Sequence, residues 1–138
     1  MASNAADAVV TRLNGTTWAS STLATNTNLF RGQVRPVSPG IPDECVFVLA
    51  TGGPTNAPYL GTGKDYRDKA VQVRVRGAID DFDGAETLAL AVHARLHRHV
   101  PTGWVDFLVN EPQPIWIGFD DDRHPEFSLN IRARVSEA

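Results

Sequence analysis

The segment from Ala70 to Arg76 constrains the fold more than any other part of the chain. Its sequence, Ala-Val-Gln-Val-Arg-Val-Arg, alternates valines with polar and basic side chains. Because successive side chains of a β-strand point to opposite faces, the pattern predicts a strand with one apolar and one basic face. The apolar face must be covered by other elements of the same chain, and the basic face requires solvent or an anionic partner.

A second strand of this kind is predicted near the C-terminal end. The segment from Phe127 to Val135 alternates apolar residues with Ser128, Asn130, Arg132 and Arg134. Shorter strands are predicted at 29–34, 104–109 and 115–119. The continuous apolar run from Val46 to Ala50 is typical of a buried strand.

Two helices are predicted. The first covers Ser3 to Leu13, with Ser3 or Asn4 as its N-cap and Asn14-Gly15 as its stop. The second is capped by Asp83, with Glu86 three residues later, and its apolar stripe consists of Ala85, Leu88, Ala89, Val92 and Leu96. The elements do not alternate as βαβ units. We therefore expect a single α+β domain over residues 1–138, a mostly antiparallel sheet with two helices packed on one face.

The stretch from Thr51 to Lys69 is predicted to be a long loop between strands, because it contains four glycines and two prolines. A loop of this length in a compact domain usually carries a function or orders against a partner. We interpret it as an assembly loop, whose candidate contact residues are Gly52, Gly53, Tyr59, Leu60, Lys64 and Tyr66.

Composition excludes several classes of protein. The formal net charge of -3 provides no overall attraction to nucleic acid, and no apolar run is long enough to span a membrane. The N-terminus lacks the basic and apolar regions of a secretory signal. Cys45, the only cysteine, precludes an internal disulfide and is interpreted as a buried thiol among apolar neighbours.

No motif predicts catalysis, a cofactor or a metal. Gly61-Thr62-Gly63-Lys64 lacks the first glycine of a phosphate-binding loop and has Asp65 where a hydroxyl residue is required. His93 and His97 have metal-ligand spacing but no visible third ligand, so we interpret them as polar residues beside the apolar stripe. Asp120-Asp121-Asp122 is interpreted as an acidic turn between strands, because the calcium-loop spacing is absent. A metal-dependent hydrolase built on these residues remains a rival hypothesis.

The basic strand faces are the remaining candidate site. If the two basic strands are neighbours, Arg74, Arg76, Arg132 and Arg134 are expected to form a compact positive patch. Its partner would be a carboxylate of another subunit or a phosphate backbone, and the alternative is a solvated sheet face. The acidic overall charge favours ion pairs between subunits. A nucleic-acid-binding module that uses the same arginines is the alternative function.

The order of these segments resembles a known family. An apolar strand runs into Thr51-Gly52-Gly53-Pro54, and a long loop and the basic strand follow. After the alanine-rich helix comes the late segment Pro114-Ile115-Trp116-Ile117-Gly118-Phe119-Asp120, and Arg123, Pro125 and Phe127-Ser128-x-Asn130 follow it. Over about residues 27 to 135, the chain resembles the tail-terminator group of tailed-bacteriophage minor capsid proteins, which act in tail completion and head–tail joining.

The resemblance implies a non-enzymatic structural protein of the virion neck. It implies a homo-oligomeric ring, commonly of six copies, that caps the tail tube and docks to the head-completion or connector protein. It further implies assembly in the bacterial host cytoplasm, passage of DNA through the ring, and no cofactor or membrane. In this interpretation the four arginines face the channel or a neighbouring subunit.

Overall fold

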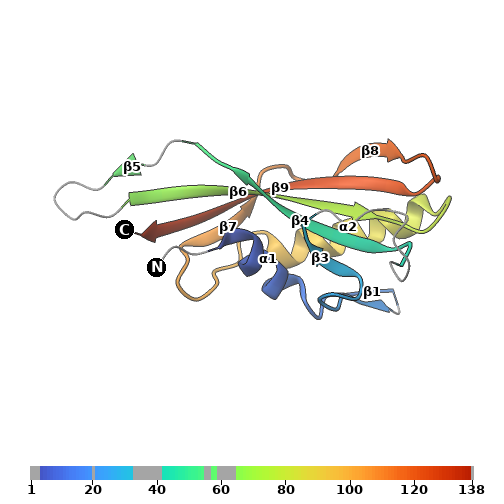
Figure 1. Ribbon diagram of the computed structural model, residues 1–138, viewed down its shortest axis with the longest axis horizontal. Coiled ribbons are helices and arrows are strands. Elements are labelled where there is room, and N and C mark those ends of the chain that lie inside the picture. Colours follow the sequence, from blue (N-terminus) through green and yellow to red (C-terminus); the bar gives the residue numbers. More distant parts are fainter. Residues whose placement is uncertain (1–3, 20, 33–41, 55–56, 59–64, 138) are drawn as a thin grey trace.

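The structure is a computed structural model that describes residues 4–19, 21–32, 42–54, 57–58 and 65–137. Its elements in chain order are α1 (Ala5–Leu13), β1 (Thr17–Trp18), β2 (Ser21–Thr22), β3 (Leu29–Arg31), β4 (Cys45–Gly52), β5 (Ala57–Pro58), β6 (Asp65–Arg76), α2 (Phe82–Leu96), β7 (Asp106–Val109), β8 (Ile115–Phe119) and β9 (Pro125–Glu137). Figure 1 shows α1 and α2 on the same side of the long strands β6 and β9. The predicted α+β fold, with two helices against a mostly antiparallel sheet, is confirmed.

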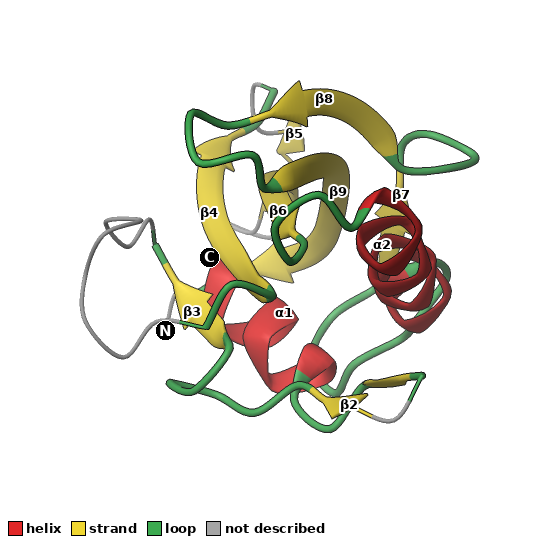
Figure 2. Cartoon of the chain, turned by 90° about the vertical axis from the view of Figure 1, so that its right-hand side faces the viewer, coloured by secondary structure: helices red, strands yellow, loops and turns green. Residues whose placement is uncertain are grey.

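The main sheet is built around the antiparallel pair β6–β9, and its strand order is β3-β4-β6-β9-β7. β5 pairs with the beginning of β6, while β8 pairs with the beginning of β9. Every pair in this sheet is antiparallel except β3–β4, which is parallel. The end-on view of Figure 2 shows β4, β6, β8 and β9 curving together in the upper part of the molecule, with α1 below them and α2 to their right.

The core lies between the apolar face of this sheet and the helices. Val71, Val73 and Val75 of β6 are buried, as the alternation predicts. They share one apolar cluster with alternate residues of β9 and with the buried stripes of both helices. Burial of this surface supplies the main driving force for the fold.

The helix boundaries partly differ from the prediction. Asn4 caps α1, because its side chain accepts a hydrogen bond from the Asp7 amide at 3.0 Å. The predicted cap at Asp83 is wrong. The cap of α2 is Asp81, whose carboxylate accepts from the Gly84 amide, and Asp83 lies in the first turn.

The long loop is shorter than predicted. Residues 65–69 are not loop but the first part of β6, where they pair with residues 133–137 of β9. Cross-strand pairing compensates for the polar sequence here, since Asp68 lies directly opposite Arg134. Strands β6 and β9 therefore form a long ribbon that extends to the left in Figure 1, where β5 also lies.

The segment from 16 to 27, for which the sequence predicts no element, contains the small hairpin β1–β2. Trp18 is buried there, and its indole nitrogen donates to the Glu44 carboxylate at 3.2 Å. The hairpin is thereby connected to the residues just before β4.

Candidate assembly surface

The predicted arginine patch is not compact. β6 and β9 are neighbours, as the hypothesis required, but their register places Arg74 opposite Ser128 and Arg132 opposite Ala70. These two arginines are offset by four positions, or about 13 Å along the strands. Arg76 and Arg134 are separated further, because they lie opposite Glu126 and Asp68. The patch prediction is wrong because the arginines lie toward the C-terminal end of each strand. Antiparallel pairing places those two ends at opposite ends of the ribbon.

Two of the four arginines are held by partners within the chain. Arg76 is only 2% exposed, and its guanidinium donates to the carbonyl oxygens of Pro42 and Asp43 at 2.8 and 2.9 Å. Arg134 forms a bidentate ion pair with Asp106 of β7, at 2.6 Å for Nε and 2.5 Å for Nη2. Hydrogen bonding from Arg134 lowers the pKa of the Asp106 carboxyl below its ordinary value, despite the opposing effect of burial.

The other two arginines lie on a face of mixed charge. Arg132 is 49% exposed at its side chain and lies 3.8 Å from the Asp68 carboxylate. Arg74 is half-buried near Glu126. Burial, and then the charge of Asp120, raise the pKa of Glu126, although Arg74 and Arg76 oppose that effect. The outer face of the ribbon therefore alternates acids and bases and is not uniformly basic.

Half of the predicted assembly-loop residues can be placed. Gly52 ends β4, Gly53 follows it, and Tyr66 lies in β6 opposite Ser136. Tyr59, Leu60 and Lys64 lie outside the described residues. Gly53 has a local structural role, because a Cβ atom there would lie 2.1 Å from the backbone oxygen of Asp68. Whether these residues contact another subunit stays a prediction.

An exposed apolar surface, which sequence reasoning did not select as a site, lies around β8. We define the β8 surface as Ile79, Phe82, Ile115, Trp116, Ile117 and Phe119, which are 37–55% exposed. Trp116 is its centre, with the rings of Phe82 and Phe119 at centroid distances of 4.9 and 5.3 Å. Phe127, a core residue, supports it from below at 5.2 Å. The signal in the sequence was the run Ile-Trp-Ile-Gly-Phe, which we interpreted only as a strand and family signature.

β8 is also an edge strand within the described part of the chain, since its only pairing there is with β9. An exposed edge strand presents unpaired backbone donors and acceptors, and proteins normally protect such edges with charge, proline or a cover. Here the edge instead carries large apolar side chains. Such a combination is typical of a surface that another protein covers.

An acidic turn adjoins this surface. Asp120–Asp122 joins β8 to β9, as predicted, and the Asp120 carboxylate accepts from the amides of Asp122 and His124. Burial raises the pKa of Asp120, but these hydrogen bonds and the interaction with the His124 ring outweigh it and lower the pKa. His124, which sequence reasoning missed, is buried and bridges Asp120 to Asp43, with nitrogen–oxygen distances of 2.9 and 3.0 Å.

The histidines on α2 make local contacts. His93 Nε2 lies 2.8 Å from the Glu111 carbonyl oxygen, and His97 Nδ1 accepts from the Val109 amide. His99 packs at the edge of the core against the ring of Phe107. Within the described ranges, no three His, Cys, Asp or Glu residues are grouped to hold a metal ion.

Comparison with protein families decides the class of this chain. Residues 9–137 match the family model described as bacteriophage tail terminator protein. The chain belongs to this family. The match covers the whole of the main sheet, including the β8 surface and the ribbon, all of α2 and the second half of α1. No curated protein matches the chain.

Membership of this family gives the protein a structural role in completing the phage tail, as a component of the virion. It also implies contacts with other structural proteins of the phage. Neither of the two described helices is long and apolar enough to cross a membrane.

Cys45 is buried, as predicted, and burial raises the pKa of its thiol to about 11.

Proposed function

We propose that the protein assembles into a closed ring of identical copies that caps the tail tube and joins it to the head connector. The observation that carries the proposal is the β8 surface, an exposed apolar edge in a member of a tail terminator family. A ring requires a heterologous interface, in which one surface of each copy meets a different surface of the next.

The size of the β8 surface supports a protein partner. Its six side chains are roughly two-fifths exposed. With roughly 150–200 Å² for each such side chain when fully exposed, their exposed areas sum to about 400–500 Å². Ile115 and Trp116 point to opposite faces of β8, because they lie opposite Ser128 and Phe127 of β9. This sum is about half of the ~800 Å² that one partner contributes to a standard interface, so a partner that wraps the β8 edge would cover it.

The remaining parts of the proposal rest on the resemblance. Six copies per ring, DNA passage through its channel and assembly in the host cytoplasm are expectations of this kind. Arg132 is the one exposed residue among the four arginines, since Arg74 and Arg134 are half-buried and Arg76 is buried. It is therefore the best candidate for a contact with a neighbouring copy or DNA. Gly52 and Gly53, at the end of β4, are proposed to contact the neighbouring copy or the tube. The separated arginines give no specific support to the nucleic-acid-binding alternative.

Sedimentation velocity on the purified protein, alone and with tail tube protein, tests the proposal. We expect a discrete oligomer in the wild type. Phe119→Ser and Ile117→Ser should shift it toward protomers, because each removes apolar area from the β8 surface while leaving the core intact. Val100→Ser, at a residue 65% exposed outside the β8 surface, is the matched control and should assemble as the wild type does. A wild-type protein that stays monomeric even with tube protein would contradict the proposal.

A further inference from the structure

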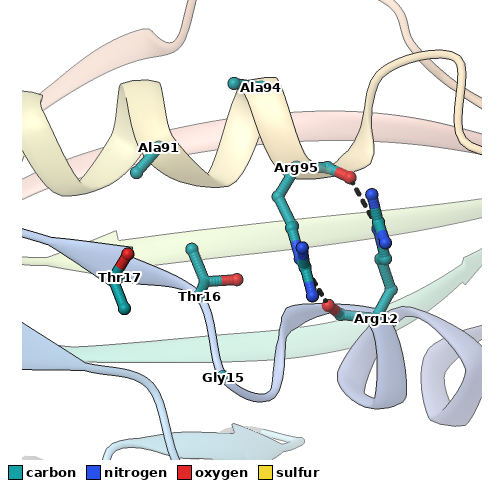
Figure 3. Close-up of a pocket in the computed structure, with 7 residues that line it drawn as sticks. All are labelled: Arg12, Gly15, Thr16, Thr17, Ala91, Ala94 and Arg95. Carbon is teal, nitrogen blue, oxygen red and sulfur yellow. Dashed lines mark hydrogen bonds between the residues drawn. The ribbon is translucent and has the colours of Figure 1, made fainter.

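A pocket of about 390 Å³ lies between the end of α1 and the second half of α2. Its lining residues, drawn in Figure 3, are Arg12, Gly15, Thr16, Thr17, Ala91, Ala94 and Arg95. The pocket is distinct from the β8 surface, which borders the first turn of α2. Its chemistry is unusual because two cations share one wall.

The two arginines are held side by side by reciprocal hydrogen bonds. Arg12 Nε donates to the Arg95 carbonyl oxygen at 2.9 Å, and Arg95 Nε donates to the Arg12 carbonyl oxygen at 3.1 Å. Each bond satisfies a carbonyl in the last turn of a helix, and together they fix both guanidinium groups beside the pocket. The terminal Nη atoms of both side chains are not used by these bonds.

No anion within the described residues neutralises this pair. Neither Arg12 nor Arg95 forms an ion pair with a described carboxylate. Burial, and then the charge of Arg95, lower the pKa of Arg12, which is the direction expected for a cation that lacks an anionic partner.

A third donor is also unsatisfied. Thr16 is 5% exposed, and its buried Oγ1 has no hydrogen-bond partner among the described residues. Figure 3 shows this hydroxyl pointing along the pocket toward the two arginines. Buried polar groups are normally paired, so an orphaned hydroxyl beside two unneutralised guanidinium groups indicates a ligand with acceptor oxygens.

We infer that this pocket is a carboxylate-binding socket for a second copy of the chain, and that the Asp121 or Asp122 side chain of that copy occupies it. A carboxylate matches the fork of an arginine and can accept from two donors at once. This inference rests on the proposed ring, because it identifies the socket as the surface that meets the acidic turn and the β8 surface of the neighbouring copy.

Charge complementarity selects this occupant. Asp121 and Asp122 are exposed, and their carboxylates make no hydrogen bond or ion pair with described residues, in contrast to Asp120. The acidic turn adjoins the β8 surface, so its insertion would also bring that apolar surface against the neighbour. A polyanionic nucleic acid fits less well, because the chain has a net charge of -3.

The geometry favours a contact between copies. Helix α2 has 15 residues and is therefore about 22 Å long. The acidic turn lies near its first turn, where Phe82 contacts β8, whereas the socket lies along its second half. Acid and socket at different places on the same protomer are compatible with the head-to-tail contact that a closed ring repeats.

Complementary charge reversal tests the socket. The first variant carries Arg12→Glu and Arg95→Glu, and the second carries Asp121→Lys and Asp122→Lys. Each variant alone should assemble with a dissociation constant raised roughly tenfold or more, because like charges then meet in the socket. Mixing the two variants should restore oligomers that contain both. The acidic turn of the first variant then meets the basic socket of the second, and the basic turn of the second meets the acidic socket of the first. Native mass measurement distinguishes mixed from uniform oligomers.

Controls separate the possible failures. Circular dichroism and melting curves establish that each variant folds; if the first does not, Arg95→Gln replaces it and should still weaken assembly. If each of the two variants, measured alone, assembles as strongly as the wild type, the socket inference is wrong but the ring proposal is not contradicted. A wild type that never assembles, even on tube protein, would overturn the ring itself. Binding of short duplex DNA that is lost only in the first variant would overturn the carboxylate in favour of a phosphate ligand.

Discussion

Arg76 and Arg132 show how differently two arginines on the same sheet face can be used. Arg76 is buried at the end of β6, where it binds two backbone carbonyls and lies 5.9 Å from the centre of the Phe47 ring. Arg132 is half exposed, and its ion pair with Asp68 is long. Solvent-screened pairs of this kind contribute little to stability, whereas buried charge-assisted hydrogen bonds contribute more.

We therefore predict unequal costs for the same substitution. Arg76→Met should lower the free energy of unfolding by about 2–3 kcal/mol, because it leaves the Pro42 and Asp43 carbonyls without their donor. Arg132→Met should lower it by about 0.5 kcal/mol or less. Urea denaturation of both variants measures the difference. Equal decreases in the free energy of unfolding would show that the hydrogen bonds of Arg76 to Pro42 and Asp43 do not stabilise the fold.

The Asp106–Arg134 pair should make stability depend on pH. The folded pKa of Asp106 lies below its ordinary value of 3.8, so the pair stabilises the protein above about that pH. This contribution is lost as the pH falls through the lower, folded pKa. Asp106→Asn should remove about 1–2 kcal/mol at neutral pH and reduce the loss of stability on acidification.

Urea midpoints at several pH values between 7 and 3 provide the measurement. Arg134→Gln is the matched control, because it removes the other half of the pair and should flatten the acid dependence similarly. The double variant should then lose little more than either single variant. A wild-type acid slope retained in Asp106→Asn would contradict the role of the pair.

At the level of elements, the end of β4 depends on two glycines with positive φ. Gly52 (φ +87°) has open space where a Cβ would lie, whereas a Cβ at Gly53 (φ +140°) would meet the Asp68 backbone. Gly52→Ala should therefore cost about 1 kcal/mol through strain alone. Gly53→Ala should cost more, about 2–3 kcal/mol, because backbone must also shift. Thermal unfolding compares the two, and equal melting temperatures would contradict a close approach of β4 to β6.

Alternation and helical spacing correctly predicted the strands and helices that bury one face. They did not predict element boundaries that depend on tertiary contacts. β6 was predicted from Ala70 because its valines begin there, yet pairing with β9 extends it back to Asp65. Glycine and proline content correctly indicated a break after β4 but could not indicate where pairing resumes. The cap of α2 lies two residues earlier than predicted. Glu86 completes a capping-box pattern with Asp83 that Asp81 lacks, and only the backbone path selects Asp81.

The candidate site was less predictable than the fold, for a physical reason. Neighbouring strands were inferred correctly, but register determines which side chains meet, and no local pattern in either strand specified that register. The socket joins Arg12 to Arg95, 83 residues apart in sequence, so only the packing of α1 on α2 creates it. The β8 run was visible in the sequence, but its exposure was not, since a buried strand has the same composition.

At the level of the whole molecule, two surfaces are available for one repeating contact. The β8 surface and its acidic turn lie near the first turn of α2, and the socket lies along the second half of the same helix. This polarity suits identical copies that bind head to tail. It also explains how a protomer with a net charge of -3 can associate with itself, because each contact would pair a local acid with a local base.

The central claim is that the protein acts as a closed ring of identical copies. The most direct measurement is the native mass of the purified protein with tail tube protein, recorded over a range of protein concentrations. We predict one discrete number of copies of the chain per complex, unchanged as concentration rises, because a closed ring leaves no free interface for further growth. A protomer that never associates, or a ladder of oligomers that lengthens continuously with concentration, would contradict the account.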